Sequence, residues 1–398
     1  MCVSLFPASP RSSGVFREIM RIFAISDVHT DYRANLEYVQ GLSQTAYKED
    51  AVIVAGDVSD RLATLRTTLQ LFTEKFGHGN HDVWVTRDEV FHSPSPSRNP
   101  THTRSSGNGS SSGSSSNPKF ADSAAKLQYI FTMCDEMGIV TTPKRLAWQR
   151  QWTENTPPAP PPSDRSSNPS EGTIWVVPLL SWYHTDFDTE PDIPNLPLPP
   201  VEQVITDFAT CRWPDGLSAA DGSRALAEYF DQMNDRRLNG SGKRNIRSWD
   251  DIDVSVEQVI SFSHFLPRLD LLPEKRFLFY PNLPKAVGSD LLGQRVARLR
   301  PDMHVFGHTH FGWDTQINGT RFLQLALSYP YERQRRLGSI EVGPFPQRLM
   351  AIWEDGAFAP QQTAHWSLYY RTHKRDPSNT ELAPWVKSRL EKHLQPEE

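Results

Sequence analysis

Short apolar runs and amphipathic stretches alternate over the first part of the chain. Residues 21–26 and 51–55 are apolar runs rich in β-branched side chains, which is typical of buried strands. Residues 34–42 and 62–76 place apolar side chains at helical spacing. The order strand, helix, strand, helix predicts an α/β fold, in which helices cover a parallel sheet.

The remaining apolar patterns predict further elements of both kinds. We expect strands at residues 139–140, 173–180, 254–263 and 303–306, and helices at residues 120–137 and 218–238. Residues 313–317 and 321–326 flank Asn318-Gly319, a dipeptide typical of type I′ hairpins. We therefore expect these two segments to pair as antiparallel strands.

Two tracts interrupt this pattern, one with Ser-Gly repeats at residues 93–118 and one rich in Pro and Ser at residues 155–170. Neither contains enough apolar side chains to offset the entropy of ordering it, so we expect flexible surface insertions. The expected organisation is an unstructured N-terminal extension (1–19), one domain (20–354) with an insertion at 208–240 that either caps the site or decorates the surface, and a C-terminal tail (355–398).

Charge and cysteine usage narrow the classes of partner. The 398 residues have a formal net charge of −5 at pH 7, so no overall positive field attracts nucleic acid or an anionic membrane. No apolar run reaches the about 18 residues of a transmembrane helix. The three cysteines are far apart, which indicates free thiols in a reducing compartment. We expect a cytoplasmic protein, or an organellar one if residues 1–19 are a transit peptide.

Polar clusters follow several of the apolar strands. They are Asp27-Val28-His29, Gly56-Asp57, Gly79-Asn80-His81-Asp82, Ser263-His264 and Gly307-His308-Thr309-His310. Taken singly, each has an ordinary interpretation as a turn, a cap or a buried histidine. Because strand ends of an α/β sheet meet at one crevice, these side chains would converge there. Carboxylates, imidazoles and an amide without thiolates suit hard or borderline divalent ions rather than a cysteine-bound structural zinc.

The order of these clusters resembles the calcineurin-like metallophosphoesterase superfamily, over about residues 20–326. The resemblance implies two mixed β-sheets packed face to face and flanked by helices, with metal ions above the strand ends. It also implies a hydrolase whose substrate is a phosphate ester, either a phosphomonoester or a phosphodiester.

The resemblance further implies a role for each cluster residue. The implied ligands are Asp27, His29 and His310 for one ion, Asn80, His264 and His308 for a second ion, and Asp57 as a bridge between the two. Two divalent or mixed-valence ions (Mn, Fe or Zn) about 3.5–4 Å apart would activate a bridging hydroxide and clamp the phosphoryl oxygens. His81 would face the leaving group and donate a proton or hydrogen bond to it, with Asp82 orienting its ring.

Alternative functions stay open at this point. Residues 56–61 resemble the sequence signature of the protein Ser/Thr phosphatases. However, Leu62 stands where that group has Gly, and Asp82 stands where it has Glu. A second alternative is a non-catalytic scaffold that retains the fold, although all seven ligand positions and His81 are present. A nuclease is a third, but no basic and aromatic stretch near the motifs supports it.

The segment before Gly79 breaks the rule that each cluster follows an apolar strand. Only Gly77-His78 separates the helical pattern of residues 62–76 from Gly79. A helix rises about 1.5 Å per residue and a strand about 3.3 Å, so two residues cannot carry the chain from the outer face of the sheet to the crevice. Either part of residues 69–78 forms a strand, or the chain lacks an apolar segment here. We favour the second, because Thr73-Glu74-Lys75 would be poor members of a buried strand.

Overall fold

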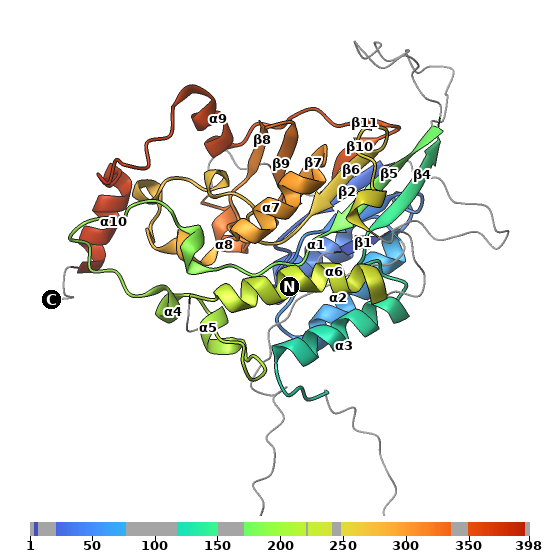
Figure 1. Ribbon diagram of the computed structural model, residues 1–398, viewed down its shortest axis with the longest axis horizontal. Helices are drawn as coiled ribbons and strands as arrows, with labels where there is room; N and C mark the ends of the chain where they lie inside the picture. The colour runs from blue at the N-terminus through green and yellow to red at the C-terminus, as the bar shows by residue number, and fades with distance from the viewer. Residues whose placement is uncertain are drawn as a thin grey trace, which may run out of the picture.

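A computed structural model describes residues 4–6, 21–76, 118–149, 171–219, 222–240, 248–335 and 349–394. These residues form two mixed β-sheets that pack face to face, with helices on the outer faces (Figure 1). The α/β sandwich is therefore confirmed.

The first sheet has the strand order β1-β3-β2-β10-β11. Its members are β1 (Ser4–Phe6), β2 (Arg21–Ile25), β3 (Ala51–Val54), β10 (Met350–Glu354) and β11 (Ala357–Phe358). Strands β2 and β3 run parallel and are joined by α1 (Arg33–Gly41), as the alternating apolar pattern predicted. Their carboxyl ends consequently point to the same edge of the sheet.

The second sheet has the order β4-β5-β6-β7-β9-β8. Its members are β4 (Lys144–Gln149), β5 (Glu171–Pro178), β6 (Gln258–Phe262), β7 (Met303–Phe306), β8 (Trp313–Ile317) and β9 (Thr320–Gln324). The run β5, β6, β7 and β9 is parallel. The predicted hairpin across Asn318-Gly319 is confirmed, with both turn residues at positive φ (49° and 87°) as a type I′ turn requires.

Successive side chains of each strand point to opposite faces of the sheet, so the core has three layers. In β2, Ile22 and Ala24 pack between the two sheets, whereas Phe23 and Ile25 pack under the helices of the first sheet. This is the two-residue period expected of a strand that is buried on both faces. The outer face of the second sheet is covered in the same way by α7 (Asp290–Leu299).

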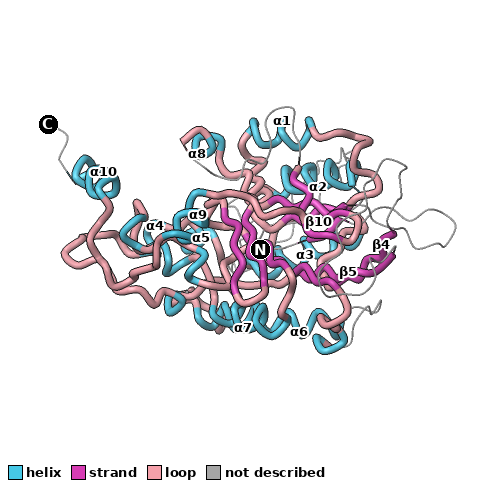
Figure 2. Tube along the Cα trace, turned by 90° about the horizontal axis from the view of Figure 1, so that it is seen from above, coloured by secondary structure: helices cyan, strands magenta, loops and turns pink. Residues whose placement is uncertain are grey.

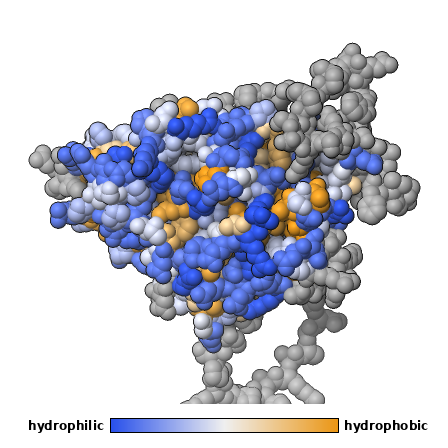
Figure 3. Space-filling model, turned by 45° about the horizontal axis from the view of Figure 1, so that its top comes forward, coloured by the Kyte–Doolittle hydropathy of each residue, from blue (hydrophilic) through white to orange (hydrophobic). Residues whose placement is uncertain are grey.

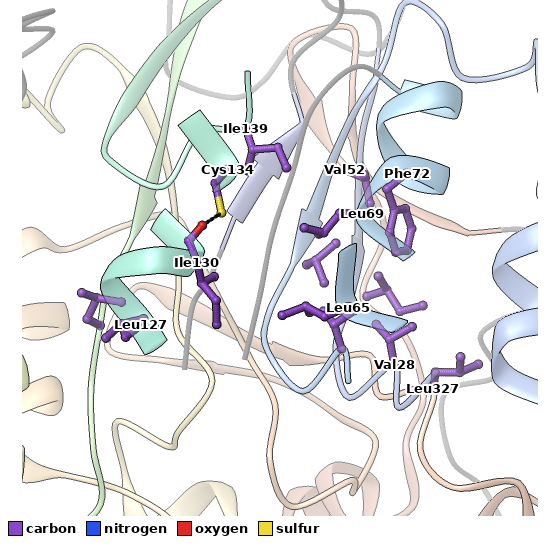
Figure 4. Packing of buried hydrophobic residues seen from close by; sticks show 14 of the residues in the cluster. Val28, Val52, Leu65, Leu69, Phe72, Leu127, Ile130, Cys134, Ile139 and Leu327 are labelled. Carbon is purple, nitrogen blue, oxygen red and sulfur yellow. Dashed lines mark hydrogen bonds between the residues drawn. The ribbon is translucent and has the colours of Figure 1, made fainter. Parts of the chain in front are cut away.

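Helix α2 (Leu62–Phe76) anchors the outer layer of the first sheet. Its side chains Leu65, Leu69 and Phe72 face Val52 of β3, and α3 (Ser123–Glu136) packs beside them (Figure 4). Helix α2 has the bounds that its apolar pattern predicted. The alternative in which this helix ends early and residues 69–76 form a strand is therefore wrong.

The expected unstructured extension at residues 1–19 needs correction. Residues 4–6 form β1, which pairs antiparallel with β3 at the edge of the first sheet. The outer edge of β3 would otherwise present unpaired backbone groups, and β1 satisfies them. Sequence periodicity could not reveal this strand, because a three-residue pairing has no pattern to detect.

The domain boundary expected at residue 354 also needs correction. Strand β11 extends the first sheet beyond β10, and α9 (His365–Thr372) packs Trp366 and Tyr370 against the outer core of the second sheet. Helix α10 (Pro384–Leu394) lies at the opposite end of the molecule from β4 (Figures 1 and 2). Burial of aromatic side chains thus makes the first part of the expected tail a part of the domain.

Several expected elements are shifted or shorter. Strand β6 begins four residues later than expected, and residues 139–140 form no strand, only a single bridge residue at Val140. The expected insertion at 208–240 is integrated into the fold, since Leu226 and Phe230 of α6 (Arg224–Gly240) are fully buried in the core. Apart from Pro118, the tracts 93–118 and 155–170 lie outside the described residues.

The surface carries small apolar patches. On the face shown in Figure 3, they are scattered within a mostly hydrophilic surface. The large apolar side chains that are exposed in the described part of the chain are Tyr32, Val204, Val256, Phe279, Tyr331, Leu368 and Trp385. No helix of the described residues is long and apolar enough to span a bilayer.

Candidate metal centre

The two sheets are joined at the edge where the strand-end clusters lie. A parallel bridge between Ser26 and Ala326 links the ends of β2 and β9, with Ser26 N donating to Leu325 O at 3.0 Å. Gly307 N donates to His264 O at 2.8 Å, which links the ends of β6 and β7. Residues far apart in the sequence therefore meet at one place, as the convergence of strand ends predicts.

Four of the expected residues form one compact group, which we call the four-residue group. One potential ligand atom from each lies within 4.8 Å of the others, and the members are Asp27, His29, Asp57 and His310. His29 Nε2 and His310 Nε2 are 2.9 Å apart, and Asp27 Oδ1 is 3.5 Å from His310 Nε2. Donor atoms of three different strand-end loops thus face one point.

A second group, which we call the three-residue group, shares one member with the first. It consists of Asp57, His264 and His308, again with ligand atoms within 4.8 Å of one another. His264 Nε2 lies 3.3 Å from Asp57 Oδ1. Since Asp57 belongs to both groups, its two carboxylate oxygens can serve two neighbouring positions.

The backbone at this edge is strained. Five of the expected site residues have positive φ, namely Asp27 (51°), His29 (44°), Asp57 (47°), His308 (73°) and His310 (58°). Such conformations are unfavourable for non-glycine residues and persist where the surrounding structure imposes them, which is frequent at functional sites. Here the strain turns polar side chains from separate loops toward one point.

Two glycines permit the close approach of these loops. A Cβ on Gly56, which has φ of +86°, would collide with the ring of His264. A Cβ on Gly307 would lie 2.9 Å from Asp27 Oδ2 and from Ala55 O. Both positions therefore require glycine, which explains why Gly precedes Asp57 and His308 in the sequence motifs.

Outer contacts hold the side chains in place. Ser26 Oγ and His308 N donate to the two oxygens of Asp27, at 2.5 Å and 2.8 Å. Three histidines each use one ring nitrogen in an outer hydrogen bond: His310 Nδ1 with Glu332 Oε2 at 2.6 Å, His264 Nδ1 with Ala55 O at 3.0 Å, and His308 Nε2 with Ala286 O at 2.9 Å. These bonds leave the other nitrogen of each ring toward the centre, as is typical of metal-binding histidines.

Electrostatic interactions keep both carboxylates ionised. Burial alone would raise the pKa of Asp27, but His310 and His264 lower it to about 2. Burial likewise opposes ionisation of Asp57, yet the adjacent His264 holds its pKa well below the usual range. A buried negative charge and a partly buried one thus stand beside one another, an arrangement that needs positive charge between them.

The four histidines of the two groups divide into two pairs by the direction in which their pKa is shifted. Burial lowers the pKa of His264 and His310, but Asp57 and Asp27 outweigh it and raise the two values to about 9. Burial dominates at His29 and His308, whose pKa values fall to about 4. Without an ion, protons on His264 and His310 balance the carboxylates, so a metal ion that binds here displaces them.

The donor set fits divalent metal ions. His264 Nε2 is buried without a hydrogen-bond partner among the described residues, and the Nε2 atoms of His29 and His310 point at each other. Without an ion, these two nitrogens can share one hydrogen bond, in which the protonated ring of His310 donates and the neutral ring of His29 accepts. A bound ion would instead accept a lone pair from each nitrogen. Nitrogen and oxygen donors without sulfur suit Zn, Mn or Fe.

A cavity of about 600 Å³ opens beside the two groups. Besides the groups themselves, its polar lining includes Asp31, Asp60, Asp207 and Glu332, and no lysine or arginine is present among its described lining residues. Asp31 Oδ2 accepts from Asp60 N at 2.9 Å. Burial, together with this neighbouring carboxylate, raises the pKa of Asp60 to about 6. The cavity is therefore acidic beyond the metal centre.

Three expected site residues lie outside the described part of the chain. They are Asn80, His81 and Asp82. Helix α2 ends at Phe76, which is buried against Tyr47 at a ring distance of 4.7 Å. The approach of Asn80 to the three-residue group therefore stays a prediction.

Sequence motifs alone did not identify Glu332 or Tyr329. Both lie at or just before the short helix α8 (Pro330–Arg333), which follows β9. Tyr329 packs on the rings of His29 and His310, with centroids 4.4 Å and 4.9 Å away. Neither follows a strand-end motif, and only the bridge between the two sheets brings their loop to the centre.

Comparisons with known proteins agree with the fold. Residues 20–164 match the family model of the calcineurin-like phosphoesterases. The acyl-carrier-protein phosphodiesterase PptH of Mycobacterium tuberculosis (strain ATCC 25618 / H37Rv) is 23% identical over 333 residues, which are 79% of this chain and 80% of PptH. The crystal structure of the phosphopantetheinyl hydrolase PptH from the same organism has a TM-score of 0.51 with 22% identity, covers 87% of this chain and 100% of its own, and shares the fold.

The match over residues 20–164 and the shared fold make this chain similar to the calcineurin-like phosphoesterases. It is a metal-dependent hydrolase of phosphoester bonds, as the order of its polar clusters predicted. Enzymes of this family use divalent metal ions, and the two groups around Asp57 are candidate positions for them.

Proposed function

We propose that this enzyme is a phosphodiesterase with two metal ions at the centre around Asp57. One ion is assigned to Asp27, His29 and His310, and the other to Asn80, His264 and His308, with Asp57 shared between them. The two overlapping groups of ligand atoms support this division. Mn, Fe and Zn all suit the donors, and the choice among them is left to metal analysis.

The protein residues have separate tasks in the proposed reaction. When bound, the ions supply Lewis acidity and lower the pKa of a coordinated water. Asp57 supplies the shared negative charge, and Glu332 fixes the ring of His310 through its outer hydrogen bond. His81 is proposed to donate a proton to the departing oxygen, with Asp82 as its orienting partner.

The negative charge of the cavity lining supports a phosphodiester, rather than a phosphomonoester, as the substrate. A phosphomonoester is close to dianionic at neutral pH, because its second pKa is about 6, whereas a diester bears a single negative charge. The cavity beyond the ligands presents Asp31, Asp60, Asp207 and Glu332, without a lysine or arginine among its described lining residues. Like charges disfavour the dianion more than the monoanion. The relative is itself named a phosphodiesterase.

The apolar part of the cavity lining favours a large organic group on the ester. Val204, Ile205, Leu283 and Trp182 contribute apolar surface to its lining. The names of the relative describe a phosphopantetheinyl group and an acyl carrier protein. We therefore propose a phosphopantetheinyl diester on a carrier protein as the natural substrate class.

A paired assay tests the proposal. Purified protein is stripped with chelator, reloaded with Mn²⁺, and assayed with bis(p-nitrophenyl) phosphate and p-nitrophenyl phosphate. We expect no turnover before reloading and a kcat/KM for the diester at least about tenfold above that for the monoester, which corresponds to roughly 1.4 kcal/mol of like-charge repulsion. Turnover that persists in metal-free protein would overturn the metal-dependent mechanism.

Two further arms decide the substrate. The double variant Asp31→Asn, Asp60→Asn should lower the ratio of kcat/KM for the diester to kcat/KM for the monoester. Glu37→Gln, on the exposed face of α1, should leave this ratio unchanged. A monoester preference in the unmodified enzyme would instead favour a phosphatase. Incubation with a phosphopantetheinylated carrier protein, followed by intact-mass measurement, should show loss of the phosphopantetheinyl group, and an unchanged mass would exclude that substrate.

A further inference from the structure

Tyr329 is held against the metal centre by its backbone. The residue before it, Ser328, has φ of 63°, and Ser328 N donates to Asp27 O at 2.9 Å. Asn35 Nδ2 and Arg333 Nη1 both donate to Ser328 O at 2.9 Å. A strained residue with this many fixed contacts places the next side chain in one direction.

The ring of Tyr329 is packed on both sides. Its inner contacts are the two histidines of the four-residue group, and its outer contact is Tyr331, whose ring is nearly parallel at 5.5 Å. Because the ring cannot move far, the position of its hydroxyl is defined in advance of substrate binding.

The hydroxyl of Tyr329 has no hydrogen-bond partner among the described residues, and Tyr329 lines the cavity beside the metal centre. Hydroxyls of buried tyrosines usually find a partner. Two other tyrosines of this chain do so: Tyr370 donates to Glu274 Oε2 at 2.7 Å and Tyr280 to Pro199 O at 2.9 Å. Because Tyr329 lines the cavity beside the metal centre, its hydroxyl is available to a substrate there.

We propose that Tyr329 is a catalytic residue whose hydroxyl donates a hydrogen bond to a non-bridging oxygen of the phosphoryl group. This role rests on the proposed function, since it requires a phosphoryl group at the metal centre. The cavity offers no lysine or arginine among its described residues, so a neutral donor meets the charge that develops on those oxygens. The hydroxyl keeps its proton throughout, and no bond to Tyr329 forms or breaks.

Tyr329→Phe tests this role, because it removes the hydroxyl and keeps the packed ring. We expect kcat/KM for bis(p-nitrophenyl) phosphate to fall by about 10²-fold, the size typical of one lost donor. We expect kcat to fall by about tenfold, because part of the hydrogen bond is already made to the bound phosphoryl group before the transition state. Metal content and Tm should stay at the values of the unmodified enzyme. Tyr331→Phe, on the exposed outer ring, is the matched control and should retain full turnover.

Two readouts separate this role from a purely structural one. With the separated phosphorothioate diastereomers of an aryl phosphodiester, the penalty of Tyr329→Phe should shrink for one diastereomer only, because sulfur is a weak acceptor. Binding of inorganic phosphate to the Mn²⁺-loaded protein, measured by calorimetry, should weaken by about tenfold in Tyr329→Phe.

Each outcome decides between the two proposals. The role of the hydroxyl is overturned if Tyr329→Phe keeps the turnover of the unmodified enzyme. It is also overturned if Tyr329→Phe loses turnover and metal together. Neither result contradicts the phosphodiesterase proposal. If the unmodified enzyme hydrolyses no diester, the proposed function fails, and phosphate binding alone decides on Tyr329: equal affinity in both proteins then overturns the role.

Discussion

The two halves of the metal centre share Asp57 but differ in how they are built. The four-residue group is complete within the described chain, and Ser26 and Glu332 support it from outside. The three-residue group has one ligand fewer, and His264 Nε2 has no hydrogen-bond partner among the described residues. Its expected further ligand, Asn80, belongs to the segment that follows α2.

This difference follows from the element that precedes each ligand. Asp27, Asp57 and His308 follow strands whose direction and register the sheets fix, so their positions are set by backbone hydrogen bonds. Asn80 instead comes four residues after the last residue of a helix on the outer face of the first sheet. We expect the ion at the four-residue group to bind more tightly than the ion at the three-residue group.

Asp57→Asn should have the largest effect, since it weakens both halves at once. The amide of asparagine carries no negative charge, so a shared carboxylate no longer balances the charge of the ion at either position. We expect metal content to fall at both positions and turnover to drop by more than the about 10²–10³-fold typical of one lost electrostatic contact. Metal analysis after gel filtration, with the diester assay, measures both. Two bound ions and near-normal turnover would show that Asp57 is not the bridge.

His310→Ala and His264→Ala break the two halves separately. The first removes a ligand of the four-residue group, and we expect it to leave less than one ion per chain. The second removes a ligand of the three-residue group, and we expect about one ion per chain to remain, because the tighter position is intact. His373→Ala, at an exposed histidine of the C-terminal region, is the control. Equal losses in both variants would mean that the halves do not differ in affinity.

Glu332→Gln sharpens the same contrast without touching a ligand. The carboxylate accepts from His310 Nδ1 at 2.6 Å, and its loss should weaken the ion at the four-residue group by about 10–100-fold. The affinity of the other position should not change, which a competition titration against a chelator can resolve. Glu37→Gln, on the exposed face of α1, serves as the matched control. An unchanged affinity at both positions would show that this outer bond does not tune the metal.

A lengthened chain before Gly79 should have the smallest effect and only on one half. Insertion of about five to eight apolar residues between Phe76 and Gly79 would allow a strand to reach the centre. We expect metal occupancy to rise toward two ions per chain, with the four-residue group unaffected. If the chain without the insertion already binds two ions tightly, Asn80 reaches its position by another path, and no apolar segment is missing.

Periodicity and motif order predicted the parts of this molecule that depend on local pattern. Helix α2, strand β7 and the hairpin across Asn318-Gly319 lie where apolar spacing and turn chemistry placed them. The convergence of Asp27, His29, Asp57, His264, His308 and His310 followed from their positions after strands. These features could be read because a buried strand or helix face leaves a periodic trace in the sequence.

What the sequence by itself determined was therefore the α/β class, the resemblance to the calcineurin-like phosphoesterases and six of the residues that meet at the centre. Only the tertiary structure decided that β1 pairs with β3, that α9 packs on the second sheet, and that Tyr329 and Glu332 reach the metal centre. The physical reason is the same in each case. An edge pairing, an aromatic contact or an outer hydrogen bond joins segments far apart in the chain, and such a contact imposes no period on either segment.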